Sequence, residues 1–326
     1  MRRVVVMALG GVGSLALSCS LLVDLDGLRG GGTDASIDAP RDAVADAGVD
    51  VDADAVADAP PDAPPPCDPT KAFDAPLAVS GLDGNGREDL ARFSSDLLTA
   101  YVLLRTPSVN GVTVELLQYE RPTLSGTFKA TLSLGIPASA LGTVMGQGHF
   151  GISESELDLV YVDAVDKSAV ECTRAARTIP FGNCAKLPDP MSSPFLLGDG
   201  SALYGVGAPG GQLPGPALAT RASNVWSAPV RITELDTFGA PTTYTHPVAS
   251  PDERTLYFAV GAPSPHVMRA TRAKTGQPFG APTAITELEV NGTFTAPTWL
   301  STDQCTIFLV TDRTGTTDIF TAKRPK

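Results

Sequence analysis

The sequence predicts an all-β protein whose C-terminal part, residues 67–326, forms a β-propeller. Glycine and proline are frequent, with 32 and 28 copies among 326 residues, and both disfavour helices. Short runs of β-branched and aromatic residues, bounded by proline, glycine, aspartate and serine, indicate strands. A segment of eleven residues also recurs along the chain, which indicates a repeat architecture. The hydrophobic content of 43% is sufficient for a core.

Three clear copies of the recurring segment define the period of the repeat. They read FDAPLAVSGLD at 73–83, WSAPVRITELD at 226–236 and FGAPTAITELE at 279–289. Weaker copies begin at Phe128 and Phe181, so successive copies start 55, 53, 45 and 53 residues apart. Such a period is typical of propeller blades or of helical solenoids. Proline in every unit opposes the solenoid.

Two further elements recur between these segments. An acidic residue precedes an aromatic one by five positions in each unit, at Asp96–Tyr101, Glu156–Tyr161, Asp199–Tyr204, Asp252–Tyr257 and Asp303–Phe308. A basic tripeptide follows, Ala-Thr-Arg at 219–221 and 270–272 and Ala-Lys-Arg at 322–324. The fourth unit contains strand-like runs at 243–249, 255–260, 267–272 and 282–287. Four short strands per unit are the composition of a propeller blade.

The order of these elements predicts how the ring closes. The last unit ends at Arg324 without an outer strand of its own, whereas the copy at 73–83 precedes every other element. We therefore expect residues 73–82 to pair as the outer strand of the last blade, which removes two exposed strand edges. This count gives five four-stranded blades. Six is the alternative, if the stretch between Tyr101 and Tyr161 contains additional strands.

The N-terminus predicts export. Met1 to Arg3 is positively charged, and residues 4–17 are apolar but shorter than the ~20 residues that span a bilayer. This pattern is typical of a signal peptide. The run ends in Leu-Ala-Leu-Ser-Cys at 15–19, which resembles a bacterial lipobox, although its Ala and Leu depart from the usual order. The resemblance implies a signal peptide over 1–19 and lipid on Cys19, and Ser20 favours the outer membrane. Ordinary secretion is the alternative.

Residues 20–66 are predicted to form an extended acidic tether. Aspartate recurs every fourth residue from Asp34 to Asp62, which in a helix would align like charges on one face. Several prolines also oppose a helix, so a self-repelling spacer is favoured. Within it, residues 31–66 contain nine aspartates and Arg41, which give −8 of the net charge of −12. The acidity argues against nucleic-acid binding and says little about the propeller's own ligand.

Two segments of the fourth and fifth units resemble a known repeat. The segment ASPDERTLYFA at 249–259 resembles the S-P-D-G-x-x-L-Y-F core of the WD40-like repeat in Tol-system periplasmic propellers. The segment TDRTGTTDIF at 311–320 resembles the turn and strand that follow it. Glu253 stands where glycine is usual, and Thr302 stands where proline is usual. The resemblance covers about 67–326 and implies the propeller architecture and an envelope location.

Four cysteines remain for disulfides once Cys19 is assigned to the lipid, and four cysteines can pair in three ways. Cys172 and Cys184 fall on predicted neighbouring strands of unit two, whereas Cys67 precedes the closing strand and Cys305 lies in the last unit. We favour Cys172–Cys184 and Cys67–Cys305, the second of which would staple the closed ring.

These observations lead us to expect a lipid-anchored, monomeric, non-catalytic binding or scaffolding module. Its partner would be an envelope protein or an extracellular ligand, and no cofactor is implied. We expect the ligand to meet loops that join the outer strand of one blade to the inner strand of the next, at 83–89, 236–246 and 289–295. The candidate residues in these loops are Asp83, Asn85, Asp89, Tyr244 and His246.

Two other functions stay open from the sequence. Asp83, Asn85 and Asp89 are spaced like oxygen ligands for Ca²⁺, which would suit a surface adhesion module, although the loop is two residues short of the usual pattern. A carbohydrate-active enzyme would need a pair of carboxylates at the central channel. The predicted inner strands there, at 92–93, 195–196, 247–248 and 298–299, are mostly apolar, and we name no catalytic residue.

Overall fold

The structure is a computed structural model that describes residues 67–326 except 83–85, 110, 143–148, 209–213, 237–242, 262–264 and 291. The expected signal peptide, Cys19 and the tether therefore lie outside the described residues. No helix among the described residues is long and apolar enough to cross a bilayer.

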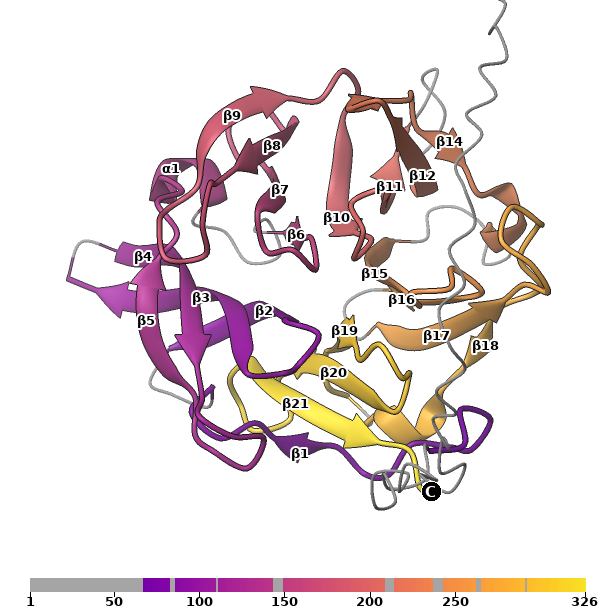
Figure 1. The fold of residues 1–326 in the computed structure, drawn as a ribbon. Coiled ribbons are helices and arrows are strands. Elements are labelled where there is room, and N and C mark those ends of the chain that lie inside the picture. The colour runs from indigo at the N-terminus through magenta and orange to yellow at the C-terminus, as the bar shows by residue number, and fades with distance from the viewer. Residues whose placement is uncertain are drawn as a thin grey trace, which may run out of the picture. The chain divides into compact units, whose positions relative to one another are not determined.

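Five antiparallel sheets follow one another around a ring (Figure 1). Blade one contains β2 (Arg87–Phe93), β3 (Thr99–Ser108), β4 (Gly111–Glu120) and β5 (Lys129–Ser133). Blade two contains β6 (Phe150–Ile152), β7 (Asp158–Val162), β8 (Ala169–Thr173) and β9 (Gly182–Lys186). Blade three contains β10 (Met191–Leu196), β11 (Ala202–Gly207) and β12 (Gly215–Ala222), with β13 (Val225–Trp226) and β14 (Val230–Arg231) at its outer edge.

Blade four contains β15 (Tyr244–Ala249), β16 (Thr255–Val260), β17 (His266–Thr271) and β18 (Thr283–Ala284). Blade five contains β19 (Thr295–Leu300), β20 (Thr306–Thr311), β21 (Asp318–Lys323) and, at its outer edge, β1 (Leu77–Ala78). The helical elements are α1 (Ala138–Leu141), η2 (Thr233–Leu235) and η3 (Thr286–Leu288). The protein is thus a five-bladed β-propeller. The six-blade alternative is wrong, because the stretch between Tyr101 and Tyr161 completes blade one and begins blade two.

The closing strand confirms the predicted topology. Leu77 pairs with Thr321 and Ala78 with Phe320, antiparallel to β21. The backbone N–H groups of Asp74 and Val79 extend this pairing to the carbonyls of Lys323 (2.7 Å) and Ile319 (2.9 Å). The first described segment of the chain thereby covers an edge that the last strand would otherwise expose.

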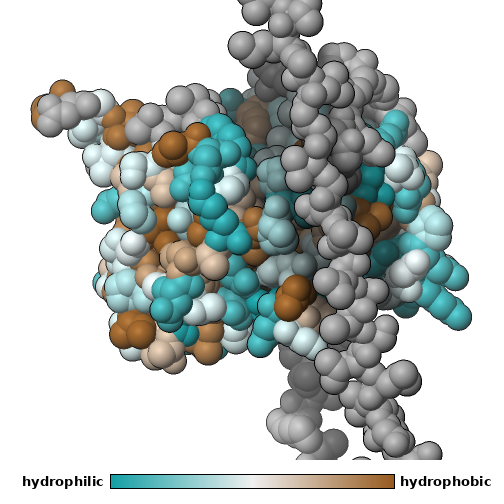
Figure 2. Space-filling view, turned by 90° about the horizontal axis from the view of Figure 1, so that it is seen from above, coloured by the Kyte–Doolittle hydropathy of each residue, from teal (hydrophilic) through white to brown (hydrophobic). Residues whose placement is uncertain are grey.

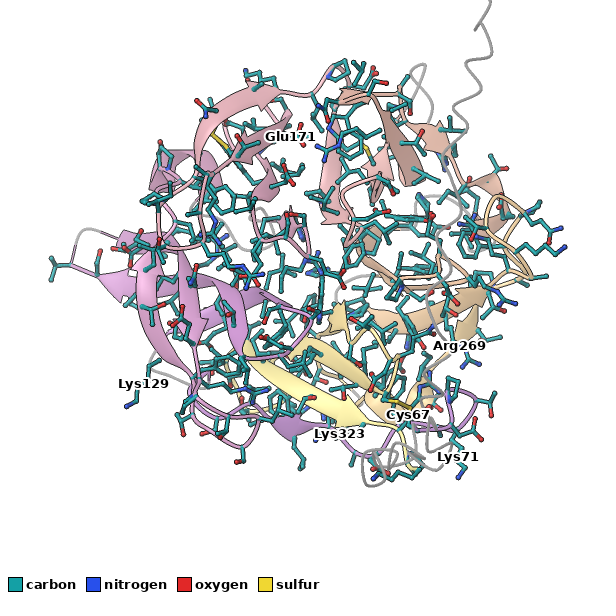
Figure 3. All side chains as sticks on the ribbon, in the orientation of Figure 1. Cys67, Lys71, Lys129, Glu171, Arg269 and Lys323 are labelled. Carbon is teal, nitrogen blue, oxygen red and sulfur yellow. A yellow bond between two sulfur atoms is a disulfide. The ribbon has the colours of Figure 1, made fainter. Side chains whose placement is uncertain are left out.

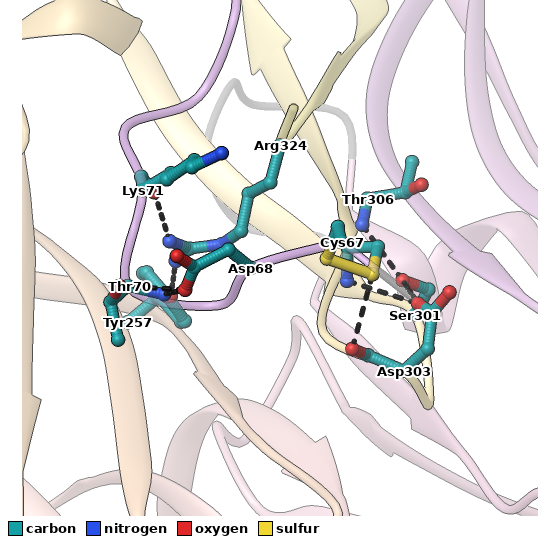
Figure 4. Close-up of a disulfide and its surroundings, with 10 residues drawn as sticks. Cys67, Asp68, Thr70, Lys71, Tyr257, Ser301, Asp303, Thr306 and Arg324 are labelled. Atoms are coloured by element: carbon teal, nitrogen blue, oxygen red, sulfur yellow. Dashed lines mark hydrogen bonds between the residues drawn. A yellow bond between two sulfur atoms is a disulfide. The ribbon is translucent and has the colours of Figure 1, made fainter. Parts of the chain in front are cut away.

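Both expected disulfides are present. Cys67 and Cys305 join the start of the closing segment to the turn before β20, with Cα atoms 5.6 Å apart (Figure 4). Cys172 and Cys184 join β8 to β9 within blade two. The first bond spans 238 residues and the second spans 12, so only the first constrains the whole ring.

The acid of the acid-to-aromatic motif shapes the turn between the first two strands of a blade, which we call the A–B turn. Asp96, Asp252 and Asp303 each accept a hydrogen bond from a serine two residues earlier, at 2.5–2.6 Å. The residue that follows each acid has a positive φ, between 53° and 59°. Short polar side chains of this kind stabilise turns by bonding to nearby groups, so this recurrent motif has a structural role.

An arginine contacts the aromatic segment within every blade, and in blades three to five this arginine is the last residue of the basic tripeptide. An arginine that ends the third strand stacks its guanidinium 4.0–5.1 Å from the aromatic ring that begins the outer segment, in the pairs Arg121–Phe128, Arg174–Phe181, Arg221–Trp226, Arg272–Phe279 and Arg324–Phe73. Such cation–π contacts stabilise partly desolvated sites. Two of the motifs that recur in the sequence, the basic tripeptide and the aromatic segment, therefore supply the two partners of the same contact.

The same arginines reach across to the preceding blade. Arg174, Arg272 and Arg324 each donate to a tyrosine hydroxyl on that blade's second strand, at 2.7–3.2 Å. In blade three the link runs differently, since Trp226 Nε1 donates to Glu171 Oε2 of blade two at 3.0 Å. Glu171 is labelled in Figure 3, where side chains fill the space between neighbouring blades. Polar contacts thus supplement the apolar packing that joins the blades.

Candidate functional site

A buried arginine occupies the axis of the propeller. Arg92 of β2 is 1% exposed. Its Nε donates to Phe150 O (3.1 Å), its Nη2 to Pro194 O (3.2 Å) and its Nη1 to Thr298 O. These carbonyls belong to the inner strands of three other blades, so one guanidinium ties four inner strands together. Burial lowers the pKa of Arg92 to about 9, which leaves it charged at neutral pH.

Two of the three histidines meet in the same channel. The rings of His149 and His246 lie 4.8 Å apart, edge to face, and Phe294 lies 5.8 Å from His246. Burial lowers the pKa of His246 well below its usual range, with smaller contributions from His149 and Arg92. His246 is therefore neutral at physiological pH. The channel interior contains cationic and neutral nitrogen groups that pack against one another.

A cavity of about 130 Å³ lies at the channel end where the A–B turns converge. We call it the axial pocket, and its lining residues are Glu154, Phe195, Leu197, Gly198, Asp199, Ala249, Pro251, Trp299, Leu300 and Thr302. They come from blades two to five. Phe195 and Trp299 belong to inner strands and their rings lie 5.8 Å apart. Arg92 stacks 5.0 Å from the Phe195 ring, so the axial arginine lies directly against a residue of the pocket.

The position of Glu154 is fixed by its neighbours. Its backbone N–H donates to Gly198 O at 2.7 Å, which ties blade two to blade three. Its carboxylate accepts a hydrogen bond from the Thr302 hydroxyl of blade five at 3.4 Å. A Cβ atom at position 198 would lie 3.0 Å from Glu154 Cδ, so the glycine leaves the space that the glutamate occupies. Glu154 is therefore held at the mouth of the pocket by two other blades.

The ligand-binding candidates from the sequence that the structure describes, Asp89, Tyr244 and His246, do not line the axial pocket. Asp83 and Asn85 lie outside the described residues. Asp89 lies in β2, where its carboxylate is engaged by Arg105 and by Thr317 Oγ1 at 3.4 Å. Tyr244 and His246 lie within β15 rather than in a loop, both are buried, and the Tyr244 hydroxyl donates to Leu235 O at 3.0 Å. Both residues therefore lie in the strand run predicted at 243–249 rather than in the exposed loop predicted at 236–246. Their part in ligand binding stays a prediction.

Metal binding gains no support from the part of the chain that the structure describes. It contains no group of three or more His, Cys, Asp or Glu side chains that could hold a metal ion. The calcium hypothesis depends mainly on Asp83 and Asn85, which are not described. The remaining member, Asp89, already has an arginine partner.

Sequence reasoning missed the axial pocket. The A–B turn places Ser95, Glu154, Gly198, Pro251 and Thr302 at the same position of blades one to five, the position where the WD40-like repeat has proline. Glu154 is the one charged residue among these five. Unit two is the poorest match to the repeat, so this exception was hidden. An alignment of the A–B turns alone would have shown it.

No protein-family model and no curated protein matches the sequence. Solved structures do match in shape. The putative TolB of Agrobacterium tumefaciens is 16% identical over 74% of this chain and 70% of its own, with a TM-score of 0.39. The propeller architecture that the WD40-like resemblance implied is present in the structure itself, as five antiparallel sheets around a ring. Sugar-cleaving propellers are similar as well. The catalytic domain of a Coprinopsis cinerea GH62 α-L-arabinofuranosidase is 13% identical over 78% of this chain and 96% of its own, with a TM-score of 0.43. A Bacteroides ovatus glycosyl hydrolase is 10% identical over 78% and 94%, with a TM-score of 0.48.

Proposed function

We propose that the protein is an exported, non-catalytic binding module of the cell envelope, held to the outer membrane by a lipid on Cys19. The signal-like residues 1–19 and the acidic segment 20–66 support export and a spacer between lipid and propeller. The two disulfides support an oxidising compartment, because such bonds persist in the periplasm or outside the cell. The protein would be secreted if Cys19 carried no lipid.

The axial pocket carries the binding role. It is a partly enclosed cavity, and Arg92, which bonds to three inner strands, lies against its Phe195 wall. Four A–B turns surround it, and each is fixed to strands of its own sheet. A pocket built on rigid elements suits recognition of a protruding group on an envelope protein. In the view of Figure 2 the visible apolar residues form small patches among polar ones. A second cavity, of about 200 Å³, lies at the outer edge of the ring, where Phe73, Arg269 and Glu287 are among its lining residues.

A carbohydrate-active enzyme is the second candidate, because Glu154 and Asp199 place two carboxylates in one pocket beside aromatic rings. Glycoside cleavage requires two carboxyl groups that flank the bond. Release of nitrophenol from a panel of aryl glycosides would establish this function, provided that Glu154→Gln abolishes it. If the protein is a binding module, we expect no hydrolysis by the unmodified chain or by Glu154→Gln.

Site-specific photo-crosslinking in cells tests the binding role. A crosslinking amino acid at Thr302, in the pocket mouth, is compared with one at Val165, which is exposed in the turn between β7 and β8. We expect one envelope protein to be captured from position 302 only, and to be lost when Glu154→Gln is added. Equal capture from both positions, or none from 302, would contradict the proposal. Loss of metabolic palmitate labelling in Cys19→Ala tests the anchor.

A further inference from the structure

The axial pocket has an unbalanced charge. Among its ten lining residues, Glu154 and Asp199 are acidic and none is basic. Asp199 uses Oδ1 to accept the backbone N–H of Ser201 at 2.8 Å, and Glu154 accepts only a neutral hydroxyl in the pocket mouth. Carboxylates that line one partly enclosed cavity give it a negative potential, which attracts a cation. The pocket therefore favours a positively charged ligand.

The aromatic rings of the pocket favour the same class of ligand. One of these rings is that of Trp299, and tryptophan is the residue type whose ring attracts a cation over its face most strongly. Phe195 already shows this behaviour on the channel side, where it receives the guanidinium of Arg92 at 5.0 Å. An apolar ligand alone would leave the two carboxylates without a partner, and an anion would be repelled by them.

The acid at the mouth is not required by the fold. Blades three, four and five form the same A–B turn with Gly198, Pro251 and Thr302, none of which is charged. Blade two alone has a glutamate there, and position 198 of the next blade is a glycine that makes room for it. A departure from the local pattern that the turn itself does not require is characteristic of functional positions.

We propose that the axial pocket receives the end of a lysine or arginine side chain of a partner protein, with Glu154 as its main ion-pairing group. Trp299 would contact the cation through its ring, and Asp199 would add to the negative potential. A cavity of about 130 Å³ has room for the end of one side chain, and the rest of the partner would lie over the surrounding A–B turns. The inference deepens the proposed function and rests on it for the nature of the partner.

The two tryptophans allow a direct measurement on the purified full chain. Trp226 lies in β13 at the outer edge of blade three, so Trp226→Phe leaves Trp299 as the one indole reporter. Short peptides that differ only in their central residue, which is lysine, arginine or norleucine, and whose other residues and blocked ends are uncharged, are titrated against this variant. We expect saturable changes in fluorescence with lysine or arginine, and none with norleucine, which has a similar shape without the charge. Calorimetry on the unmodified chain provides the same comparison if Trp226→Phe is unstable.

Glu154→Gln is the decisive variant, and Glu115→Gln is its matched control because Glu115 is an exposed acid of blade one. We expect Glu154→Gln to weaken binding of the cationic peptide by about tenfold or more, and Glu115→Gln to leave it unchanged. Binding should also weaken with added salt. Equal binding of norleucine, indifference to Glu154→Gln, or saturable binding of a neutral saccharide instead would overturn the inference. If the peptides fail while crosslinking from Thr302 persists, the proposed function stands and this inference falls.

Discussion

The hydroxyl of Tyr204 in blade three donates a hydrogen bond of 2.6 Å to the carboxylate of Glu253 in blade four. Burial, and secondly this carboxylate, raise the pKa of Tyr204, so the hydroxyl keeps its proton. Arg272 donates to the same hydroxyl at 3.2 Å and lies 3.4 Å from Glu253. Blades one and two repeat the arrangement with Tyr101, Glu156 and Arg174. The glutamate that departs from the repeat's usual glycine is therefore an inter-blade contact.

Glu253→Gly tests the energetic importance of that contact. Glu253 has φ of +53°, so glycine removes some backbone strain there, worth about 1 kcal/mol. It also removes the acceptor of Tyr204 and the counter-charge of Arg272, at a cost of about 1.5–3 kcal/mol for a hydrogen bond to a charged group. We expect a net loss of about 0.5–2 kcal/mol in unfolding free energy, measured in urea. Asn224→Gly is the control, because Asn224 also has a positive φ (+62°) and its uncharged side chain is exposed. A stabilised Glu253→Gly protein would contradict this account.

The two disulfides should differ in their effect on stability. Opening the Cys67–Cys305 bond frees a segment of 238 residues, whereas opening Cys172–Cys184 frees 12. Loop entropy predicts losses of about 5 and about 3 kcal/mol for the paired Cys→Ser variants. Urea unfolding of each double variant measures the difference. A larger loss from the Cys172–Cys184 pair would show that local packing, rather than ring closure, determines the effect.

Periodicity explains which parts of the structure could be predicted. Blade number, the closing strand at 77–78 and both disulfides follow from the order of recurring segments, because each element pairs with a neighbour at a fixed offset. The site depends instead on where four separate turns converge. Glu154 and Thr302 are 148 residues apart and meet only in the closed ring. His246 shows a limit of the same approach, because the loop predicted at 236–246 overlapped the strand run predicted at 243–249, and the structure places the residue in β15.

Stability should decrease as the pH falls below about 6.5, through His246. Its native pKa lies well below the unfolded value of about 6.5, so the unfolded chain takes up a proton that the native channel refuses. Above pH 6.5 neutral His246 makes its full contribution to the free energy of unfolding. Below pH 6.5 this free energy decreases by about 1.4 kcal/mol per pH unit, until the native pKa is reached. His246→Asn, which tolerates the positive φ of 54°, should remove this slope between pH 6.5 and 4.5. Urea unfolding across this range measures it, and an identical slope in both proteins would assign the effect to other groups.

Gly198→Ala separates the pocket's function from the stability of the blade. The added Cβ would lie 3.0 Å from Glu154 Cδ, and the flexible glutamate can move away at little energetic cost. That movement displaces the carboxylate from the mouth, so we expect weaker binding of the lysine peptide, by about tenfold as in Glu154→Gln, with a nearly unchanged melting temperature. Gly182→Ala is the matched control, because a Cβ there meets no atom within 4 Å. Full peptide affinity in Gly198→Ala would mean that the position of Glu154 does not determine binding, and the ion pair would then have to be assigned to Asp199.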